Sequence, residues 1–164
     1  MRSPMPGRFW EEFRAGEVIE HGPGRTITQA DNVLFCGLTM NNQPLHLDPE
    51  WAKRESPYGR IVVNGILTFG LAVGMSVKDL TEKTLVANLG YSEIAHPAPV
   101  YPGDTITASS KVVDKRLTSK AGRGIVTVKT TARKQDDTEV CTFTRTIMVK
   151  TKDPRLVGEA KARA

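Results

Sequence analysis

The spacing of hydrophobic and polar positions predicts short strands and helices in the first half of the chain. Between residues 18 and 28, β-branched residues are interrupted by Gly-Pro-Gly at 22–24, which predicts a strand, a turn and a second strand. Thr28, followed three residues later by Asp31, predicts a helix start. We expect this helix over residues 32–38. Its predicted core-facing residues are Val33, Leu34, Gly37 and Leu38.

Two further helices are predicted before the strand-rich half. Asp48 followed by Pro49 predicts a short helix that ends near Glu55. A longer helix is expected from about residue 64 to 78, inside a charge-free run at 61–77. A membrane-spanning helix needs about 20 mainly apolar residues, whereas this run has 17 and includes three glycines. We interpret it as a buried helix of a soluble domain. The GxxxG spacing of two of its glycines then indicates close backbone packing.

The second half of the chain contains four stretches of about ten residues that are typical of strands. They span residues 85–95, 105–115, 124–133 and 139–149. Because no helix separates them, consecutive strands must pair antiparallel. The sheet needs cover on one face, and the apolar helix is the one element suited to provide it. The sequence therefore predicts an α+β fold, a curled antiparallel sheet wrapped around one long central helix.

Composition narrows the function classes. The 164 residues suit a single domain, expected over residues 1–150, with a basic, mobile tail at 151–164. Two distant cysteines without a CxxC pair predict reduced thiols in the cytoplasm. The histidines and cysteines lack metal-ligand spacing, so no metal site is expected.

The net charge of +5 comes mainly from residues 111–134, where eight basic side chains accompany one acid. No helix-turn-helix, zinc-finger or RNA-binding strand motif accompanies this run, so neither a nucleic-acid partner nor a membrane partner is predicted. Solvated strand edges and a landing surface for a phosphorylated small molecule both remain open.

The candidate chemistry lies in one polar segment, residues 39–48, which places three side-chain amides near a histidine and an acid. Loops held by a rigid scaffold often carry function. Each side chain also has a structural interpretation. For His46 this is a ring bound to a backbone carbonyl, for Asp48 a helix cap, and for Asn41 and Asn42 turn formation.

Several short segments carry a family resemblance: Asp31, residues 37–39, residues 44–48, Ala52 and residues 61–65. Together they resemble the MaoC-like (R)-specific enoyl-CoA hydratase family. Residues 86–91 and 100–105 are similar to its mesaconyl-CoA (2-methylfumaryl-CoA) hydratase branch. The resemblance runs from about residue 7 to 150. It implies a hot-dog fold, an acyl-CoA thioester substrate, no cofactor beyond the substrate's own coenzyme A, and a homodimer or a trimer of dimers.

The resemblance also implies roles for individual residues. In the family motif Gly-Asp-x-Asn-Pro-x-His, the acid and the histidine hold the water that adds to the double bond. His46 matches the histidine and Pro44 the proline, whereas Asn41 replaces the acid and Gln43 the asparagine. An amide orients a water but cannot take its proton. A variant site and a non-catalytic acyl-CoA-binding module both stay open.

Gly65 matches the family glycine at the start of the central helix, whose backbone N–H polarises the thioester carbonyl. We expect Asn64, Arg60 and Gln43 to contact substrate, with Arg60 as the candidate partner of a second carboxylate. The remaining two residues of the expected site, Asp48 and Pro44, are expected to shape it.

Physical chemistry favours the same roles. Water addition to an α,β-unsaturated thioester pushes negative charge onto the carbonyl oxygen, and a helix N-terminus supplies N–H donors and a positive dipole end there. His46 is the one residue nearby in sequence whose type titrates near neutral pH. The expected function is reversible hydration of a short branched enoyl-CoA, with mesaconyl-CoA first. Itaconyl-CoA and a plain 2-enoyl-CoA are alternatives. A thioesterase on the same fold is a second enzymatic alternative, but it would need a carboxylate at the thioester, and no Glu or Asp lies inside the central helix expected at about 64–78.

Overall fold

The computed structural model describes residues 7–158, and its elements follow the predicted order. The strands are β1 (Val18–Thr26), β2 (Leu85–Ala95), β3 (Thr105–Leu117), β4 (Arg123–Lys134) and β5 (Glu139–Lys150). The helices are α1 (Gln29–Leu38), α2 (Pro44–Leu47), α3 (Pro49–Glu55) and α4 (Gly65–Leu80), preceded by a short 3-10 helix, η1 (Trp10–Glu12). The four strands predicted in the second half are confirmed to within two residues at each end.

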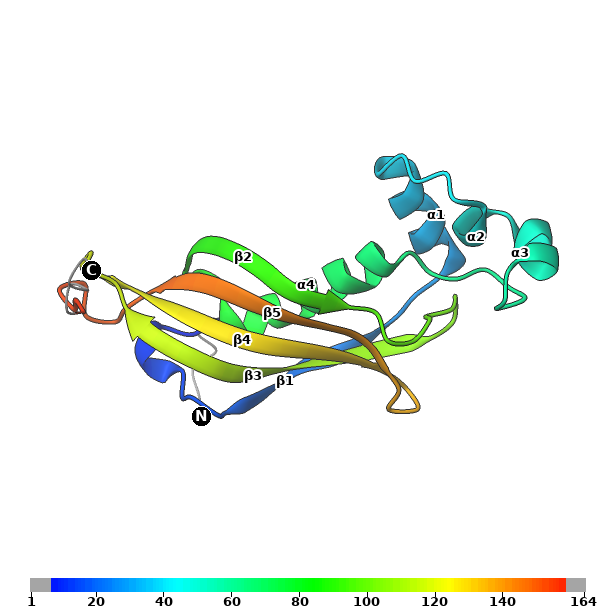
Figure 1. Ribbon diagram of the computed structural model, residues 1–164. Coiled ribbons are helices and arrows are strands. Elements are labelled where there is room, and N and C mark those ends of the chain that lie inside the picture. Colours follow the sequence, from blue (N-terminus) through cyan, green and yellow to red (C-terminus); the bar gives the residue numbers. More distant parts are fainter. Residues whose placement is uncertain (1–6, 159–164) are drawn as a thin grey trace.

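The strands form one antiparallel sheet in the order β1-β3-β4-β5-β2 within the described residues. Burial alternates along β4, where Val126, Val128, Thr130 and Ala132 face inward, because successive side chains of a strand point to opposite faces. Helix α4 lies against the inner face, while α1, α2 and α3 project from one end of the sheet (Figure 1). The predicted α+β fold, a curled sheet around one long helix, is confirmed.

The first strand differs from the prediction. No turn reverses the chain at residues 22–24; β1 is one strand whose register against β3 shifts between His21 and Arg25. Such an irregularity bends a strand without ending it. Gly24 fits there because a Cβ at this position would lie 3.0 Å from the carbonyl oxygen of Ile106. The prediction of a strand, a turn and a strand is therefore wrong.

Helix α1 begins as predicted but faces the other way. Thr28 accepts a hydrogen bond from the Asp31 backbone and donates its own N–H to that carboxylate, which lowers the pKa of Asp31. The predicted core face is wrong, because the buried residues are Asn32 and Cys36. The exposed side carries Val33, Leu34 and Leu38. Since α1 stands beyond the end of the sheet, only one narrow side of it meets the rest of the chain.

The polar segment at 39–48 is not a loop throughout, because Pro44 opens the short helix α2. Proline suits a first helical position, since its φ is already helical. The predicted start of α3 is confirmed: Asp48 accepts a hydrogen bond from the Trp51 N–H at 2.9 Å, and Pro49 follows it.

The core lies between α4 and the sheet. Phe69 of α4 packs edge-to-face on Phe143 of β5 and on Tyr91 of β2, with ring centroids 4.9 Å apart in both pairs. The inward-facing Arg145 donates hydrogen bonds to Asn88 and to α4, and burial lowers its pKa. The hydrophobic residues of α4 thus hold the helix in a fixed position over the sheet.

The chain after β5 turns back onto the β3–β4 turn. The Thr151 N–H donates to the Gly122 carbonyl, and the Gly122 N–H donates to the Leu156 carbonyl. The remainder of the predicted tail, residues 159–164, lies outside the described residues. Over residues 7–158, no helix combines the length and the apolar character that crossing a membrane requires.

The aromatic contacts predict a large stability effect on one side of β5 only. Phe143→Ala should lower the free energy of unfolding by about 3–5 kcal/mol, because it leaves a cavity under α4. Thr142→Ala, one residue away on the opposite face, should change it by no more than about 1 kcal/mol. Denaturant titration of both variants measures the difference. Equal losses would contradict the assigned inner face.

Candidate active site

One buried side chain joins three segments at the start of α4. Asn32 of α1 is fully buried, and its Nδ2 donates to the His46 carbonyl oxygen of α2 at 2.9 Å. Its Oδ1 accepts the backbone N–H of Asn64 at 2.9 Å. A single amide therefore fixes the histidine segment against the residue that precedes the central helix.

The ring of His46 is fixed in one orientation. Its Nδ1 lies 2.7 Å from the carbonyl oxygen of Val62, which only accepts hydrogen bonds, so Nδ1 carries the proton. In the neutral ring, Nε2 is then unprotonated and basic. Within residues 7–158, no hydrogen bond engages Nε2. A purely structural role for His46, with its ring bound to a backbone carbonyl, accounts for Nδ1 only. Nε2 is available to a ligand.

The N-terminus of α4 presents an unused donor. Asn64 is buried and caps the helix, since its Oδ1 accepts the Ile66 N–H at 2.9 Å. Among the described residues, no acceptor takes the N–H of Gly65. This N–H stands at the positive end of the dipole of a 16-residue helix. Gly65 thus offers a polarising donor, while the side chain of Asn64 is occupied within the fold.

A second imidazole lies against the same helix end. A Cβ built on Gly65 would lie 3.2 Å from Cε1 and Nε2 of His96 and 3.3 Å from its Cδ2. Nearly equal distances to three consecutive ring atoms mean that Gly65 faces the flat side of the ring. The sequence offers little to identify this contact, because His96 is a single exposed histidine between β2 and a proline.

The other predicted residues of the polar segment surround the short helix α2. Asn41 forms a turn, since its Oδ1 accepts the Gln43 N–H at 3.1 Å. Gln43 is the exposed residue that precedes α2, and Pro44 is the first residue of that helix. Asp48 caps α3. No contact between the side chains of Asn41 and His46 appears among the described hydrogen bonds.

Two cations flank an aromatic ring next to the site. The guanidinium of Arg60 lies 3.5 Å from the centroid of the Tyr101 ring, and the Nζ of Lys134 lies 5.8 Å from it. The Val63 N–H donates to the Val100 carbonyl at 2.8 Å, which ties this segment to the approach of α4. Cations over an aromatic face are attracted to its negative potential. Arg60 is therefore placed by Tyr101, with its charge exposed.

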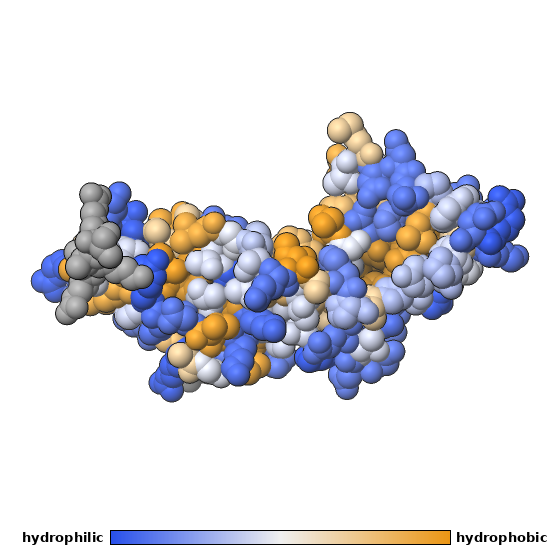
Figure 2. Space-filling model, viewed as in Figure 1, coloured by the Kyte–Doolittle hydropathy of each residue, from blue (hydrophilic) through white to orange (hydrophobic). Residues whose placement is uncertain are grey.

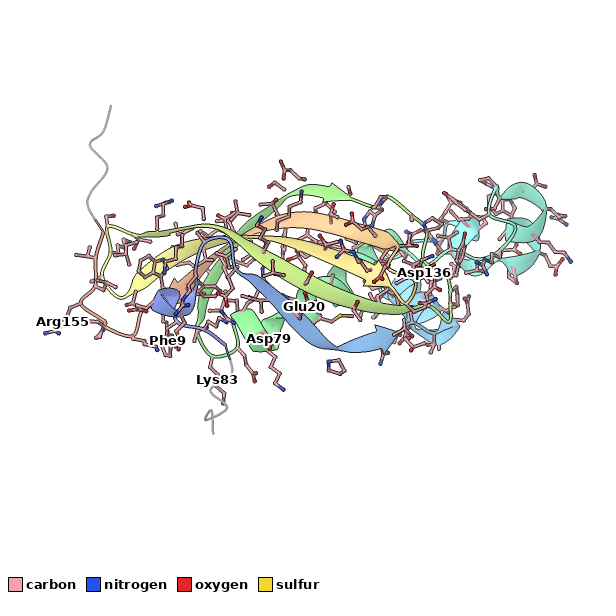
Figure 3. All side chains as sticks on the ribbon, turned by 90° about the horizontal axis from the view of Figure 1, so that it is seen from below. Phe9, Glu20, Asp79, Lys83, Asp136 and Arg155 are labelled. Carbon is pink, nitrogen blue, oxygen red and sulfur yellow. The ribbon has the colours of Figure 1, made fainter. Side chains whose placement is uncertain are left out.

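The basic run at 111–134 does not form one patch at the site. Lys115 donates to two backbone carbonyls in and after η1, and burial lowers its pKa. Arg133 pairs with Glu139. The β3–β4 turn is bonded to the segment that carries Arg155, at the opposite end of the molecule from Asp136 on the β4–β5 turn (Figure 3). Of this run, Lys134 is the residue that meets the Arg60 and Tyr101 pair.

A serine, a histidine and an acid also meet near the C-terminal end of α4. His21 lies 3.1 Å from Asp79 and 2.8 Å from Ser110. Asp79 is about 20 Å along the helix from Gly65. Ser110 is fully buried and also bonded to Thr130, so no substrate reaches it. Across residues 7–158, no group of three or more His, Cys, Asp or Glu could hold a metal ion.

Comparison with known proteins points to one family. A family model described as "MaoC like domain" matches residues 12–134. Beta-methylmalyl-CoA dehydratase of Chloroflexus aurantiacus is 34% identical over 91% of this chain. Mesaconyl-CoA hydratase of Cereibacter sphaeroides is 34% identical over 90% of it. Each alignment covers 42% of the relative, so the chain matches less than half the length of either.

Among solved structures, a Mycobacterium tuberculosis protein described as having a double hot-dog fold superposes with a TM-score of 0.81 and 23% identity. The match covers 96% of this chain and 52% of that one. The expected hot-dog fold is thereby confirmed.

The hydrogen bonds of Asn32 predict a stability effect centred on the site. Asn32→Leu keeps the size of the side chain but leaves the His46 carbonyl and the Asn64 N–H without partners. We expect a loss of about 2–3 kcal/mol in the free energy of unfolding. Asn42→Leu, on the exposed turn, should stay within about 0.5 kcal/mol. Denaturant titration of both variants measures these free energies. An Asn32→Leu protein with the stability of the wild type would contradict the anchoring role.

Proposed function

This chain belongs to the MaoC-like domain family, and from that premise we propose that it reversibly hydrates an enoyl-CoA thioester. One observation carries the proposal: the unprotonated Nε2 of His46 and the unused N–H of Gly65 belong to two segments that hydrogen bonds of Asn32 and Val62 tie together. These are two of the groups that water addition to an enoyl thioester requires, a base and a donor to the carbonyl oxygen.

The proposed chemistry follows from these two groups. The Gly65 N–H donates to the thioester carbonyl, and the helix dipole stabilises the negative charge that develops on its oxygen. The carbonyl then withdraws electrons from the double bond, so that the β-carbon accepts the oxygen of water. His46 takes the water proton at Nε2, because Nδ1 is committed to Val62. The chain needs no cofactor for this, since coenzyme A is part of the substrate.

We propose a short branched enoyl-CoA as substrate, with mesaconyl-CoA first. The support comes from the names of the two relatives and from the exposed charge of Arg60, which suits a second carboxylate. The Lys134 ammonium next to Tyr101 is a candidate contact for a coenzyme A phosphate. Itaconyl-CoA and unbranched 2-enoyl-CoA remain the alternatives for the acyl group. Both cysteines are free and buried, which supports a reducing cytoplasmic location.

A non-catalytic acyl-CoA-binding role is the second candidate, and the residue at position 41 favours it. Asn41 supplies no proton acceptor, and its Oδ1 already accepts the Gln43 N–H. The two functions differ in one optical property. Hydration removes the ultraviolet absorption of the conjugated enoyl thioester, whereas binding leaves it unchanged.

The absorbance assay, run on a panel of enoyl-CoA thioesters, also tests His46. Wild-type protein should bleach the conjugated thioester. His46→Gln should lower kcat by about 100-fold or more with little change in KM, because it removes the base but keeps a polar side chain. Thermal unfolding checks that the variant folds. Bleaching by neither protein would favour the binding module, and full turnover by His46→Gln would remove His46 from the mechanism.

We further propose that a second copy of this chain covers the exposed side of α4. Ile66, Gly70, Gly74 and Val77 are exposed along one stripe of this helix. A Cβ on either glycine would meet nothing within 4 Å, so the close packing predicted for the GxxxG sequence does not occur inside the described chain. Strand β2 is an edge strand that also exposes apolar side chains.

Figure 2 shows hydrophobic residues at the surface over α4 and at the tip of α1. Exposed apolar surface of this extent beside an unpaired strand edge is typical of a subunit interface. The double hot-dog protein supports pairing of two such units, because two units of this fold occur in one molecule there.

The proposed interface predicts that charged substitutions in the exposed stripe of α4 change the oligomeric state. Gly70→Lys/Gly74→Lys should shift the protein from a dimer or larger assembly to a single chain in sedimentation at micromolar concentration. The helix should remain folded, because lysine has a higher helix propensity than glycine. Ser119→Lys, an added charge on the β3–β4 turn, is the control and should leave the mass unchanged. A wild-type monomer would contradict the proposed partner.

A further inference from the structure

His96 is an exposed imidazole that the fold brings against Gly65, the first residue of α4. Its ring lies flat against Gly65 with ring atoms 3.2–3.3 Å from the position of a Cβ. The ring is exposed, and none of the described hydrogen bonds uses its nitrogens. A group in this place covers the backbone that we propose as the donor to the thioester carbonyl.

The proposed binding mode brings the ring near one reacting carbon. A thioester oxygen bonded to the Gly65 N–H puts the thioester carbonyl next to the residue that the His96 ring contacts. The α-carbon is attached directly to the carbonyl carbon, so it is the reacting carbon nearer to Gly65. The β-carbon is one bond further away.

Hydration needs a proton at the α-carbon, and position 41 does not supply it. Water addition places a hydroxyl on the β-carbon and a proton on the α-carbon, so one group takes a proton and one gives a proton. The side chain of Asn41 neither accepts nor donates a proton in this pH range, and it is bonded to Gln43. Among the described residues, His96 is the imidazole that lies against Gly65.

We propose that His96 is the acid that protonates the α-carbon, with His46 as the base for water. This inference rests on the proposed hydratase function. In the step, the water oxygen bonds to the β-carbon while its proton moves to Nε2 of His46. The electrons of the double bond move toward the carbonyl and return to form the bond between the α-carbon and the proton released by the His96 imidazolium. His46 ends protonated and His96 neutral, and exchange with solvent restores both.

The elements around the start of α4 carry a small set of charged or titratable side chains. They are Cys36 on α1, His46 on α2, Arg60 before α4, Glu93 on β2, Tyr101 before β3 and Lys134 on β4. The carboxylate of Glu93 accepts a hydrogen bond from Thr144. The first turn of α4 carries no acid. No carboxylate among the described residues lies within ion-pair distance of His96.

The pH dependence of turnover tests this assignment. With His46 as base and His96 as acid, kcat/KM of the wild type should fall on both sides of an optimum, because the mechanism requires an unprotonated base and a protonated acid. His96→Gln should lower kcat by about 100-fold and remove the alkaline limb. His46→Gln is the matched variant and should remove the acid limb instead.

The possible results separate the inference from the function on which it rests. If the wild type hydrates no enoyl-CoA, the proposed function is contradicted. If the wild type is active and His96→Gln keeps both its turnover and the alkaline limb, only the role of His96 is overturned. If His96→Gln loses activity but keeps the alkaline limb, the ring has a packing role and the inference is equally overturned. Because His96 is exposed, the variant should unfold at the wild-type temperature.

Discussion

The two hydrogen bonds of the Asn32 amide are the constraint on which the site depends. They tie the carbonyl of His46 to α1 and the backbone of Asn64 to the same residue, so the base and the helix end keep one relative position. An unpaired amide in this buried place would be costly, which makes the arrangement specific as well as stable. The chemistry we propose depends on this fixed geometry, because proton transfer and carbonyl polarisation must act on neighbouring atoms of one substrate.

The sheet and α4 provide the rigidity behind that geometry. The apolar face of α4 packs on the inner residues of the sheet, and the aromatic contacts around Phe143 fix its position. The polar residues cluster at the N-terminal end of α4, where the backbone still has unused donors. Val63 and Leu67 on either side of this end belong to the core, so the packing that stabilises the fold also holds the site.

Much of the fold was predictable from the sequence, whereas much of the site was not. Alternation in β4 and β5 and the charge-free run of α4 depend on local periodicity, which a sequence shows directly. The orientation of α1 was missed because Val33, Leu34 and Leu38 look like a core face, although the buried side carries Asn32 and Cys36. A polar residue that joins three distant segments leaves no local pattern.

The same distinction applies to the residues proposed for chemistry. His46, Asn64 and Gly65 were accessible to sequence reasoning, because they lie in short motifs at a helix start. The contact of His96 with Gly65 joins residues 31 positions apart and appears only once the chain is folded. The stacking of Arg60 on Tyr101 is likewise a product of the fold.

The central claim is that the N-terminus of α4 receives the thioester carbonyl, and a crystal structure with a saturated acyl-CoA bound tests it most directly. A saturated chain cannot react, so the complex persists. The account predicts a carbonyl oxygen about 2.7–3.2 Å from the Gly65 nitrogen, with the β-carbon facing Nε2 of His46. A thioester bound elsewhere, with the Gly65 N–H left to solvent, would contradict it.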